Sequence, residues 1–168
     1  MTSTTAVIAI SRNGSDLARR LAASLEDDPT LYLDRRFMDG GEDAAIFDLP
    51  VRPVVEKAFG EYQRLVLFMP VGAAVRLLAA RLSHKHSDPA VVCVDDAGRF
   101  AVSLLSGHTG GADQLAREVA SILGSTAVIT SASHVTGTLA VDLLGKEFGW
   151  RMDASSTVVT RVSAAVIN

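Results

Sequence analysis

The stretch Leu65-Val66-Leu67-Phe68-Met69 decides the fold class of this chain. An uninterrupted apolar run of this length is typical of a strand covered on both faces, as in a parallel sheet between layers of helices. Pro70-Val71-Gly72 ends the strand, and Ala73–Leu82 is rich in Ala, Leu and Arg, which favours a helix. A buried strand that leads through a short turn into a helix is the repeating unit of an α/β fold.

The same alternation extends in both directions along the chain. Apolar runs bounded by turn residues predict further strands at Ala6–Ile10, Leu31–Leu33, Val91–Asp95, Phe100–Leu105 and Ala127–Thr130. Apolar residues at helical spacing predict helices that start at a Ser15 cap and at Pro53, and that span Ala112–Leu123 and Leu139–Phe148. Residues 34–50 lack periodicity and predict a surface loop. We therefore expect an α/β, three-layer fold with a mostly parallel sheet, a local β-hairpin at Asp96-Ala97-Gly98-Arg99 and flanking helices.

The composition is that of a globular protein without a nucleic-acid or membrane partner. Of the 168 residues, 48% are hydrophobic and 21% are charged, and the net charge is −3. A protein that binds a phosphate backbone shows a basic patch instead. We find no signal peptide and no apolar run that could span a bilayer, so we expect a cytoplasmic protein. Cys93, the only cysteine, lies in an apolar run and is predicted to be a buried strand residue rather than a nucleophile.

A glycine-rich loop before the predicted helix Ala112–Leu123 is the most informative candidate site. It reads Ser106-Gly107-His108-Thr109-Gly110-Gly111. Glycines let backbone N–H groups approach a ligand, and a helix N-terminus offers unpaired donors to an anion. The pattern matches neither the dinucleotide-binding fingerprint nor the phosphate loop. We predict that Ser106, Gly107, Gly110 and Gly111 bind an anionic ligand group. The alternative is that these glycines only allow a tight turn.

The position of this loop in the sheet can also be predicted. In open α/β sheets, ligands bind at the carboxyl ends of the strands. Unusual loops follow the predicted strands at Ser11–Gly14, Pro70–Gly72, Ser106–Gly111 and Ser131–His134. We therefore expect the Ser106–Gly111 loop to lie beside the Pro70–Gly72 loop at the carboxyl edge, where both would face one pocket.

Titratable and cationic side chains near these loops supply the candidate chemistry. His108 is the candidate general base, because imidazole titrates near neutrality and this one lies between glycines at a strand end; a structural role is the alternative. His84 and His86 flank Lys85, but their spacing matches no zinc pattern, and we predict no metal site. Arg76 and Lys85 are candidate cations for ligand carboxylates, although each is also an ordinary surface residue by type.

Ordered blocks of sequence make the chain resemble the family of cobalamin-biosynthesis protein CbiG. The blocks are Gly72-Ala73-Ala74-Val75-Arg76, Lys85-His86-Ser87-Asp88-Pro89-Ala90-Val91-Val92, Val94-Asp95, Gly98-Arg99-Phe100, Ser103-Leu104-Leu105-Ser106-Gly107-His108, Gly110-Gly111-Ala112 and Leu115-Ala116. The Asn13-Gly14 turn and the helix after it also resemble the family's N-terminal start.

The resemblance implies a hydrolase of the oxygen-independent route to vitamin B12. Such an enzyme opens a δ-lactone in cobalt-precorrin-5A and releases acetaldehyde, giving cobalt-precorrin-5B. The substrate is a cobalt-bearing macrocycle fringed with acetate and propionate groups, so cobalt is expected as part of the substrate and no separate cofactor is expected. In this scheme His108 activates water, and N–H groups around Gly110 and Gly111 stabilise the oxyanion.

The chain departs from the family pattern in sequence and in length. Asp113 stands where the family commonly has Asn. His134 ends Thr130-Ser131-Ala132-Ser133-His134, where the family commonly has Thr-Thr-Ala-Thr-Asp; we include it among the predicted substrate-binding residues. Family members are about twice as long and carry a C-terminal domain. We predict an N-terminal α/β domain over residues 1–125 and the truncated family middle segment over 126–168, with a homodimer or a separate C-terminal partner.

Two other functions fit the sequence. The chain could be a non-catalytic tetrapyrrole-binding module that needs a C-terminal domain or partner for activity. It could also be a nucleotide-binding regulatory domain, which the acidic strand end Asp95-Asp96 and the glycines support faintly.

Overall fold

The computed structural model describes residues 4–41, 43–84, 87–108 and 110–131, together with Val158, Arg161 and Val162. One sheet has the strand order β3-β2-β1-β4-β5-β6-β7. Its strands are β1 (Thr5–Ala9), β2 (Thr30–Asp34), β3 (Ala45–Phe47), β4 (Arg64–Phe68), β5 (Ala90–Val94), β6 (Phe100–Leu105) and β7 (Thr126–Val128). The helices are α1 (Arg12–Ala22), α2 (Arg52–Glu61), α3 (Val71–Leu78) and α4 (Ala112–Leu123), with a 3-10 turn, η1 (Arg35–Phe37).

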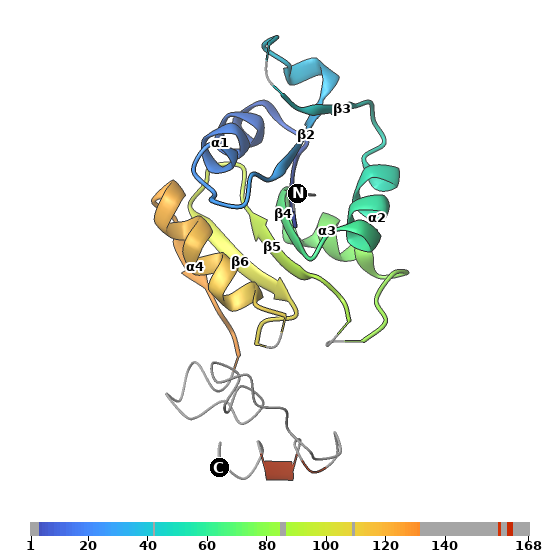
Figure 1. Cartoon of the computed structure of the whole chain (residues 1–168), viewed down its shortest axis with the longest axis vertical. Helices are drawn as coiled ribbons and strands as arrows, with labels where there is room; N and C mark the ends of the chain where they lie inside the picture. The colour runs from blue at the N-terminus through green and yellow to red at the C-terminus, as the bar shows by residue number, and fades with distance from the viewer. Residues whose placement is uncertain are drawn as a thin grey trace.

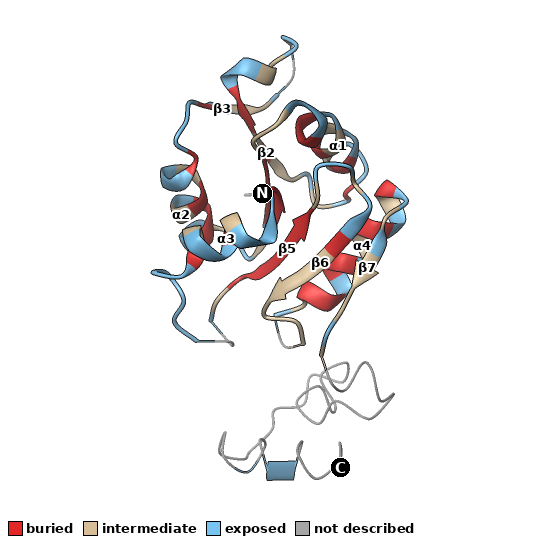
Figure 2. Cartoon of the chain, turned by 180° about the vertical axis from the view of Figure 1, so that it is seen from behind, coloured by how far each residue is buried: buried red, intermediate tan, exposed pale blue. Residues whose placement is uncertain are grey.

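The sheet lies between two layers of helices, which confirms the predicted α/β fold class. Helices α1 and α4 cover one face, and α2 and α3 cover the other (Figure 1). Successive residues of β1 serve the two cores in turn: Val7 and Ala9 pack with α1 and α4, whereas Ala6 and Ile8 pack with α2 and α3. The central strand β5 is buried along its whole length (Figure 2). Uniformly apolar strands are therefore explained by helices on both faces.

The direction of the strands gives the sheet two different ends. Strands β1 to β5 are parallel to one another, β6 returns antiparallel to β5 through the predicted hairpin, and β7 is parallel to β6. We call the end where β1, β4 and β5 finish the β1/β4 end. We call the opposite end, where β6 and β7 finish and β4 and β5 begin, the β6/β7 end.

Three predicted elements begin or end elsewhere in the structure. Helix α1 is capped by Ser11 rather than Ser15, because the Ser11 Oγ accepts a hydrogen bond from the Gly14 N–H at 3.0 Å. Helix α3 begins directly after Pro70, so Gly72 lies in its first turn and not in a loop. The predicted loop 34–50 contains η1 and β3, both too short to show periodicity. The helix predicted over Leu139–Phe148 lies outside the described residues.

Cys93 fulfils the sequence-based expectation. It is buried within β5, and burial raises the pKa of its thiol to about 12. A thiol that stays protonated and enclosed is not a nucleophile. Among the described residues, none of the helices combines the length and apolar character needed to cross a bilayer.

Asp27 links the amino ends of two central strands. Its Oδ2 accepts hydrogen bonds from the Thr4 and Thr5 hydroxyls at 2.9 and 2.5 Å, and its Oδ1 lies 3.7 Å from Arg64 Nη2. Burial alone would raise the pKa of this carboxyl, but the two hydroxyls and the Arg64 charge outweigh it, so the pKa is lowered from 3.8. Ionised Asp27 therefore stabilises the fold.

Acid should remove this contribution. Because the folded-state pKa of Asp27 lies below its unfolded value near 3.8, the stabilisation is complete above that value and is lost as pH falls through the folded pKa. We expect Asp27→Asn to reduce the loss of unfolding free energy between about pH 5 and about pH 2, measured by urea titration. Glu26→Gln, at an exposed neighbour, is the control. An equal acid sensitivity in the Asn variant would contradict this assignment.

Candidate active site

The hairpin divides the predicted site residues between the two ends of the sheet. Val91 of β5 pairs with Leu105 of β6, so the loop after β6 lies at the β6/β7 end, where the Ser106 Oγ donates to the Asp88 carbonyl at 2.9 Å. Gly72 follows β4 at the β1/β4 end. The prediction that the two loops lie side by side is therefore wrong. Because β6 runs antiparallel to β5, its carboxyl end lies at the opposite end of the sheet from the carboxyl ends of the parallel strands.

Three backbone N–H groups at the junction of the glycine loop and α4 already donate to carbonyls of the loop. The Ala112 N–H donates to the Ser106 carbonyl and the Asp113 N–H to the Gly107 carbonyl, each at 3.1 Å. The Gly111 N–H donates to the His108 carbonyl at 3.2 Å. The expectation of unpaired donors for an anion is wrong for these three groups, because the loop folds back on the start of α4.

A separate structural constraint favours glycine at each of the three glycine positions of the loop. A Cβ on Gly110 would lie 2.3 Å from the Ser106 Cβ, and one on Gly107 would lie 2.7 Å from the Asp113 Oδ1. Gly111 has a φ of 89°, which favours glycine at the N-cap of α4. Ser106 has a φ of 58° without being glycine. Its hydrogen bonds to Asp88 and Ala112 hold it in this left-handed conformation, whose cost is about 1–3 kcal/mol.

Asp113 is the centre of the site at the β6/β7 end. It lies in the first turn of α4 and is buried, with only 8% of its surface exposed. Its Oδ1 accepts from the Ser103 hydroxyl of β6 at 2.7 Å, and its Oδ2 accepts from the Ser131 hydroxyl beyond β7 at 3.1 Å. The positive end of the α4 dipole also favours a carboxylate at this position. The anion at this helix start is therefore supplied by the protein itself.

His108 faces this carboxylate. Its Nδ1 lies 3.8 Å from the Asp113 Oδ2, and its side chain is 29% exposed, so part of the imidazole reaches solvent. An imidazole with a buried carboxylate on one side and solvent on the other can accept a proton on the open side. The separation exceeds a hydrogen bond, but catalytic hydrogen bonds are often long without substrate. This pair is the arrangement at the β6/β7 end that is most suited to proton transfer.

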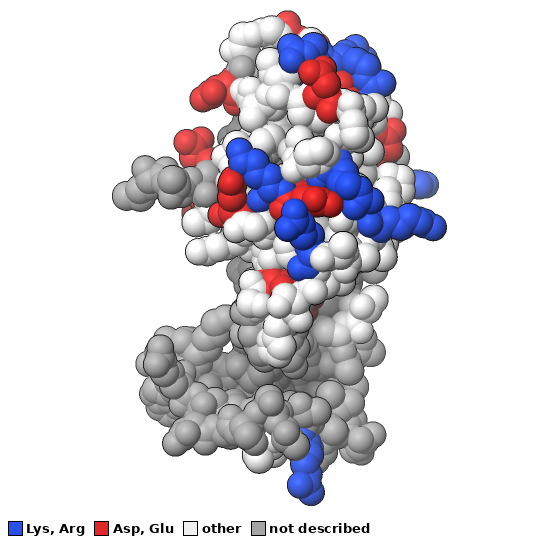
Figure 3. Space-filling view, turned by 90° about the vertical axis from the view of Figure 1, so that its right-hand side faces the viewer, with Lys and Arg blue, Asp and Glu red and all other residues white. Residues whose placement is uncertain are grey.

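Of the two predicted ligand cations, Arg76 lies in the described part of the chain, in the last turn of α3. Arg76 donates from Nη1 to the Gly72 carbonyl at 2.9 Å, within α3 itself. Arg52 and Arg81 bind the two oxygens of Glu56 at 3.2 and 3.1 Å, and hydrogen bonds from Arg81 and then Arg52 lower the pKa of Glu56. Lys and Arg side chains accordingly gather around acidic ones on this face of α2 and α3 (Figure 3). Arg76 thus belongs to a helix on the opposite face of the sheet from α4.

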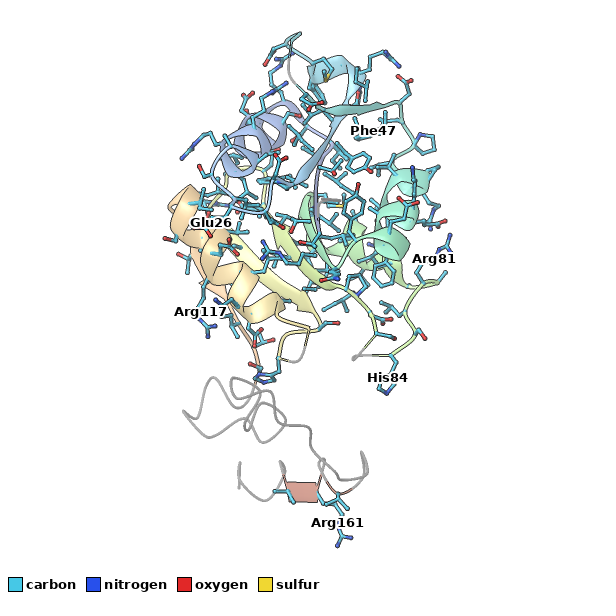
Figure 4. All side chains as sticks on the ribbon, in the orientation of Figure 1. Glu26, Phe47, Arg81, His84, Arg117 and Arg161 are labelled. Atoms are coloured by element: carbon cyan, nitrogen blue, oxygen red, sulfur yellow. The ribbon has the colours of Figure 1, made fainter. Side chains whose placement is uncertain are left out.

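The remaining candidates are only partly described. Lys85, His86 and His134 lie outside the described residues, and their predicted roles stay predictions. His84, just before Lys85, lies beyond Arg81 on the side away from Phe47 (Figure 4). The Asp88 carboxylate accepts from the Ser83 and His84 N–H groups at 3.0 and 3.2 Å, which ties their loop to the start of β5. Within the described part of the chain, His, Cys, Asp and Glu side chains form no group of three suited to a metal ion.

The sequence did not single out the residues that surround His108. Ser103 and Ser131 carry common hydroxyls, and Asp113 was noted only as a departure from a family pattern. One signal was available: an acidic residue in the first turn of a helix with apolar Ala112 and Leu115 beside it. Its burial was not predictable, because it depends on β6 and the segment after β7 meeting at α4.

Comparison with known proteins places this sheet and loop in a family. Residues 53–134 match the model described as cobalamin synthesis G N-terminal, and residues 139–168 match the cobalamin biosynthesis central region. The chain belongs to the cobalamin synthesis G family. This confirms the resemblance inferred from the sequence blocks.

Two relatives of this cobalamin synthesis G chain are named cobalt-precorrin-5A hydrolase. The protein of Priestia megaterium is 42% identical over 166 residues, covering 97% of this chain and 44% of the relative. The protein of Salmonella typhimurium is 36% identical over 163 residues, covering 97% of this chain and 45% of the relative. The chain thus spans less than half the length of these relatives.

A solved structure shows the same fold. A cobalamin biosynthesis protein G homolog from Sulfolobus solfataricus matches with a TM-score of 0.57 and 22% identity, covering 98% of this chain and 46% of that one. In our cobalamin synthesis G chain, β7 pairs with β6 in the common sheet, and the match to the N-terminal model extends to residue 134. The domain boundary predicted after residue 125 stays a prediction.

Proposed function

We propose that this chain takes part in the hydrolysis of cobalt-precorrin-5A, with lactone opening and release of acetaldehyde to give cobalt-precorrin-5B in the cytoplasm. The observation that carries the proposal is the His108 imidazole, partly open to solvent and 3.8 Å from the buried Asp113 carboxylate. The names of the two relatives support the reaction. Cobalt belongs to the substrate in this proposal, and the protein supplies orientation and proton transfer.

The first step is attack of water on the lactone carbonyl. His108 takes a proton from the water as the new C–O bond forms, and the ring C–O bond then breaks to leave a carboxylate and a hydroxyl. The new hydroxyl then gives up its proton to a base, its C–O bond becomes the C=O of acetaldehyde, and the C–C bond to the macrocycle breaks. The electron pair of that bond stays on the macrocycle, where the conjugated system of the substrate can accept it. The N–H groups of Gly111, Ala112 and Asp113 donate within the loop, so the predicted oxyanion role of this loop requires the loop to rearrange.

The second candidate is a non-catalytic tetrapyrrole-binding module that acts with a C-terminal domain, a second copy or a separate partner. It is favoured by the coverage of only 44% and 45% of the two relatives. In this case the Ser106–Gly111 loop would contact substrate, and a further domain would complete the chemistry.

One assay separates the two candidates. The purified chain is mixed with cobalt-precorrin-5A, and absorbance and acetaldehyde are followed together, with the Priestia megaterium hydrolase as a positive control for the substrate. Catalytic release of acetaldehyde, with repeated turnovers per protein molecule, supports the hydrolase. A spectral change at stoichiometric protein without acetaldehyde supports the binding module. If neither signal appears while the control enzyme is active, both candidates are contradicted for the isolated chain.

A further inference from the structure

Asp113 offers its neighbours only acceptors. An ionised carboxylate has lone pairs on both oxygens and no hydrogen to donate. The Ser103 hydroxyl occupies Oδ1 at 2.7 Å, and the Ser131 hydroxyl occupies one site on Oδ2 at 3.1 Å. These two bonds hold the carboxylate from two different elements, so its plane is fixed relative to β6. The same Oδ2 lies 3.8 Å from the His108 Nδ1.

The loop is shaped to admit this carboxylate. A Cβ on Gly107 would lie 2.7 Å from Asp113 Oδ1 and 3.2 Å from both Cγ and Oδ2, so any larger residue would displace the whole carboxylate. The Asp113 N–H is bound to the Gly107 carbonyl at 3.1 Å, which fixes the backbone on the same side. The residue before His108 is thus a glycine because the Asp113 side chain occupies the space.

The other charged groups around this pair are bound elsewhere. The Asp88 carboxylate accepts from the N–H groups of Ser83 and His84, and Arg117 Nη1 approaches the Asp113 carbonyl at 3.4 Å, not the carboxylate. Among the described residues, the Asp113 carboxylate lies 3.8 Å from the His108 ring, and Asp88 is engaged with backbone N–H groups.

We infer that Asp113 is a positioning residue that holds neutral His108 as the Nδ1–H tautomer, leaving the Nε2 lone pair as the base. A nitrogen that faces an acceptor-only oxygen is favoured when it carries the hydrogen. An unconstrained neutral histidine favours Nε2–H, so the inferred tautomer is not the default. The inference rests on the proposed function only in giving Nε2 a catalytic use.

The tautomer can be measured without substrate. Long-range ¹H–¹⁵N spectra of the ¹⁵N-labelled chain at about pH 9, above the usual titration range of imidazole, distinguish the two ring nitrogens. The His108 signals are assigned by their loss in His108→Gln. We expect a majority of Nδ1–H in the unmodified chain. A majority of Nε2–H there would overturn the inference directly.

Two variants test the cause. Asp113→Asn keeps the size of the side chain but places an amide donor among the acceptors; we expect His108 to change to a majority of Nε2–H. Ser131→Ala removes a hydroxyl from Oδ2 but keeps the charge, and should leave Nδ1–H in the majority. If Asp113→Asn folds and Nδ1–H persists, Asp113 does not set the tautomer. If the Asn variant does not fold, the inference is still tested by the other two spectra. A majority of Nε2–H in the unmodified chain or in Ser131→Ala would contradict it.

The outcome is separable from that of the hydrolase assay. A majority of Nδ1–H in a chain that releases no acetaldehyde supports the positioning role and contradicts only the hydrolase proposal for this chain. Acetaldehyde release by a chain with a majority of Nε2–H supports the hydrolase proposal and contradicts the positioning role of Asp113.

Discussion

His108→Gln should lower the rate of acetaldehyde release from cobalt-precorrin-5A by about 10²–10⁴-fold. Gln keeps much of the size and hydrogen bonding of His but cannot accept a proton from water at neutral pH. The His108 side chain is 29% exposed, and Gln fills much of the volume of the ring, so most of its packing is kept. We therefore expect the affinity for the macrocycle and the melting temperature to change little.

The matched control is His84→Gln, at an exposed histidine of the same end of the sheet. Single-turnover measurements with the protein in saturating excess over substrate separate the chemical step from binding. If acetaldehyde release is unchanged in His108→Gln, His108 is not the base. If affinity falls but saturated turnover does not, His108 is a ligand contact. A loss of the same size in His84→Gln would show that the effect is not specific to the Asp113 pair.

The sequence was sufficient for the layers of the fold because its strands are uniformly apolar. Val66 and Leu67, adjacent in β4, are both fully buried, one in each core. A strand with that pattern requires helices on both faces, and alternating strands and helices supply them. The short strand β3 was missed because three residues beside a polar loop carry no periodicity.

The sequence drew attention to His108 and its glycine loop, but not to their location in the sheet or to the residues that surround them. The hairpin at Asp96–Arg99 was predicted, and it already implied that β6 runs against β5. The rule that ligands bind at the carboxyl ends of parallel strands does not extend to β6, and Ser106–Gly111 therefore lies away from Gly72. The hydrophobic pattern predicts that a strand exists. The end of the sheet at which that strand finishes depends on whether it pairs parallel or antiparallel with its neighbour. The contacts of Asp113 depend on Ser131, which is distant in sequence, and so required the fold.

Gly110→Ala should reduce the free energy of unfolding by about 1–3 kcal/mol, the range for forcing extra volume into a packed site. The added Cβ would lie 2.3 Å from the Ser106 Cβ and 2.7 Å from the Ser106 carbonyl oxygen. Backbone cannot yield as a flexible side chain can, so the loop must shift. That oxygen accepts from the Ala112 N–H at 3.1 Å, and the shift should therefore loosen the first turn of α4.

Urea unfolding and hydrogen exchange of the Ala112 amide measure the two effects, and Gly60→Ala is the control. Gly60 lies in α2 with no atom within 4 Å of an added Cβ, so alanine there should increase stability by about 0.5–1 kcal/mol through its better helix propensity. Opposite signs at the two glycines would show that Gly110 is fixed by contact with Ser106 and not by a general need for flexibility. Unchanged stability and unchanged Ala112 protection in Gly110→Ala would mean that the loop does not pack against the start of α4 in this way.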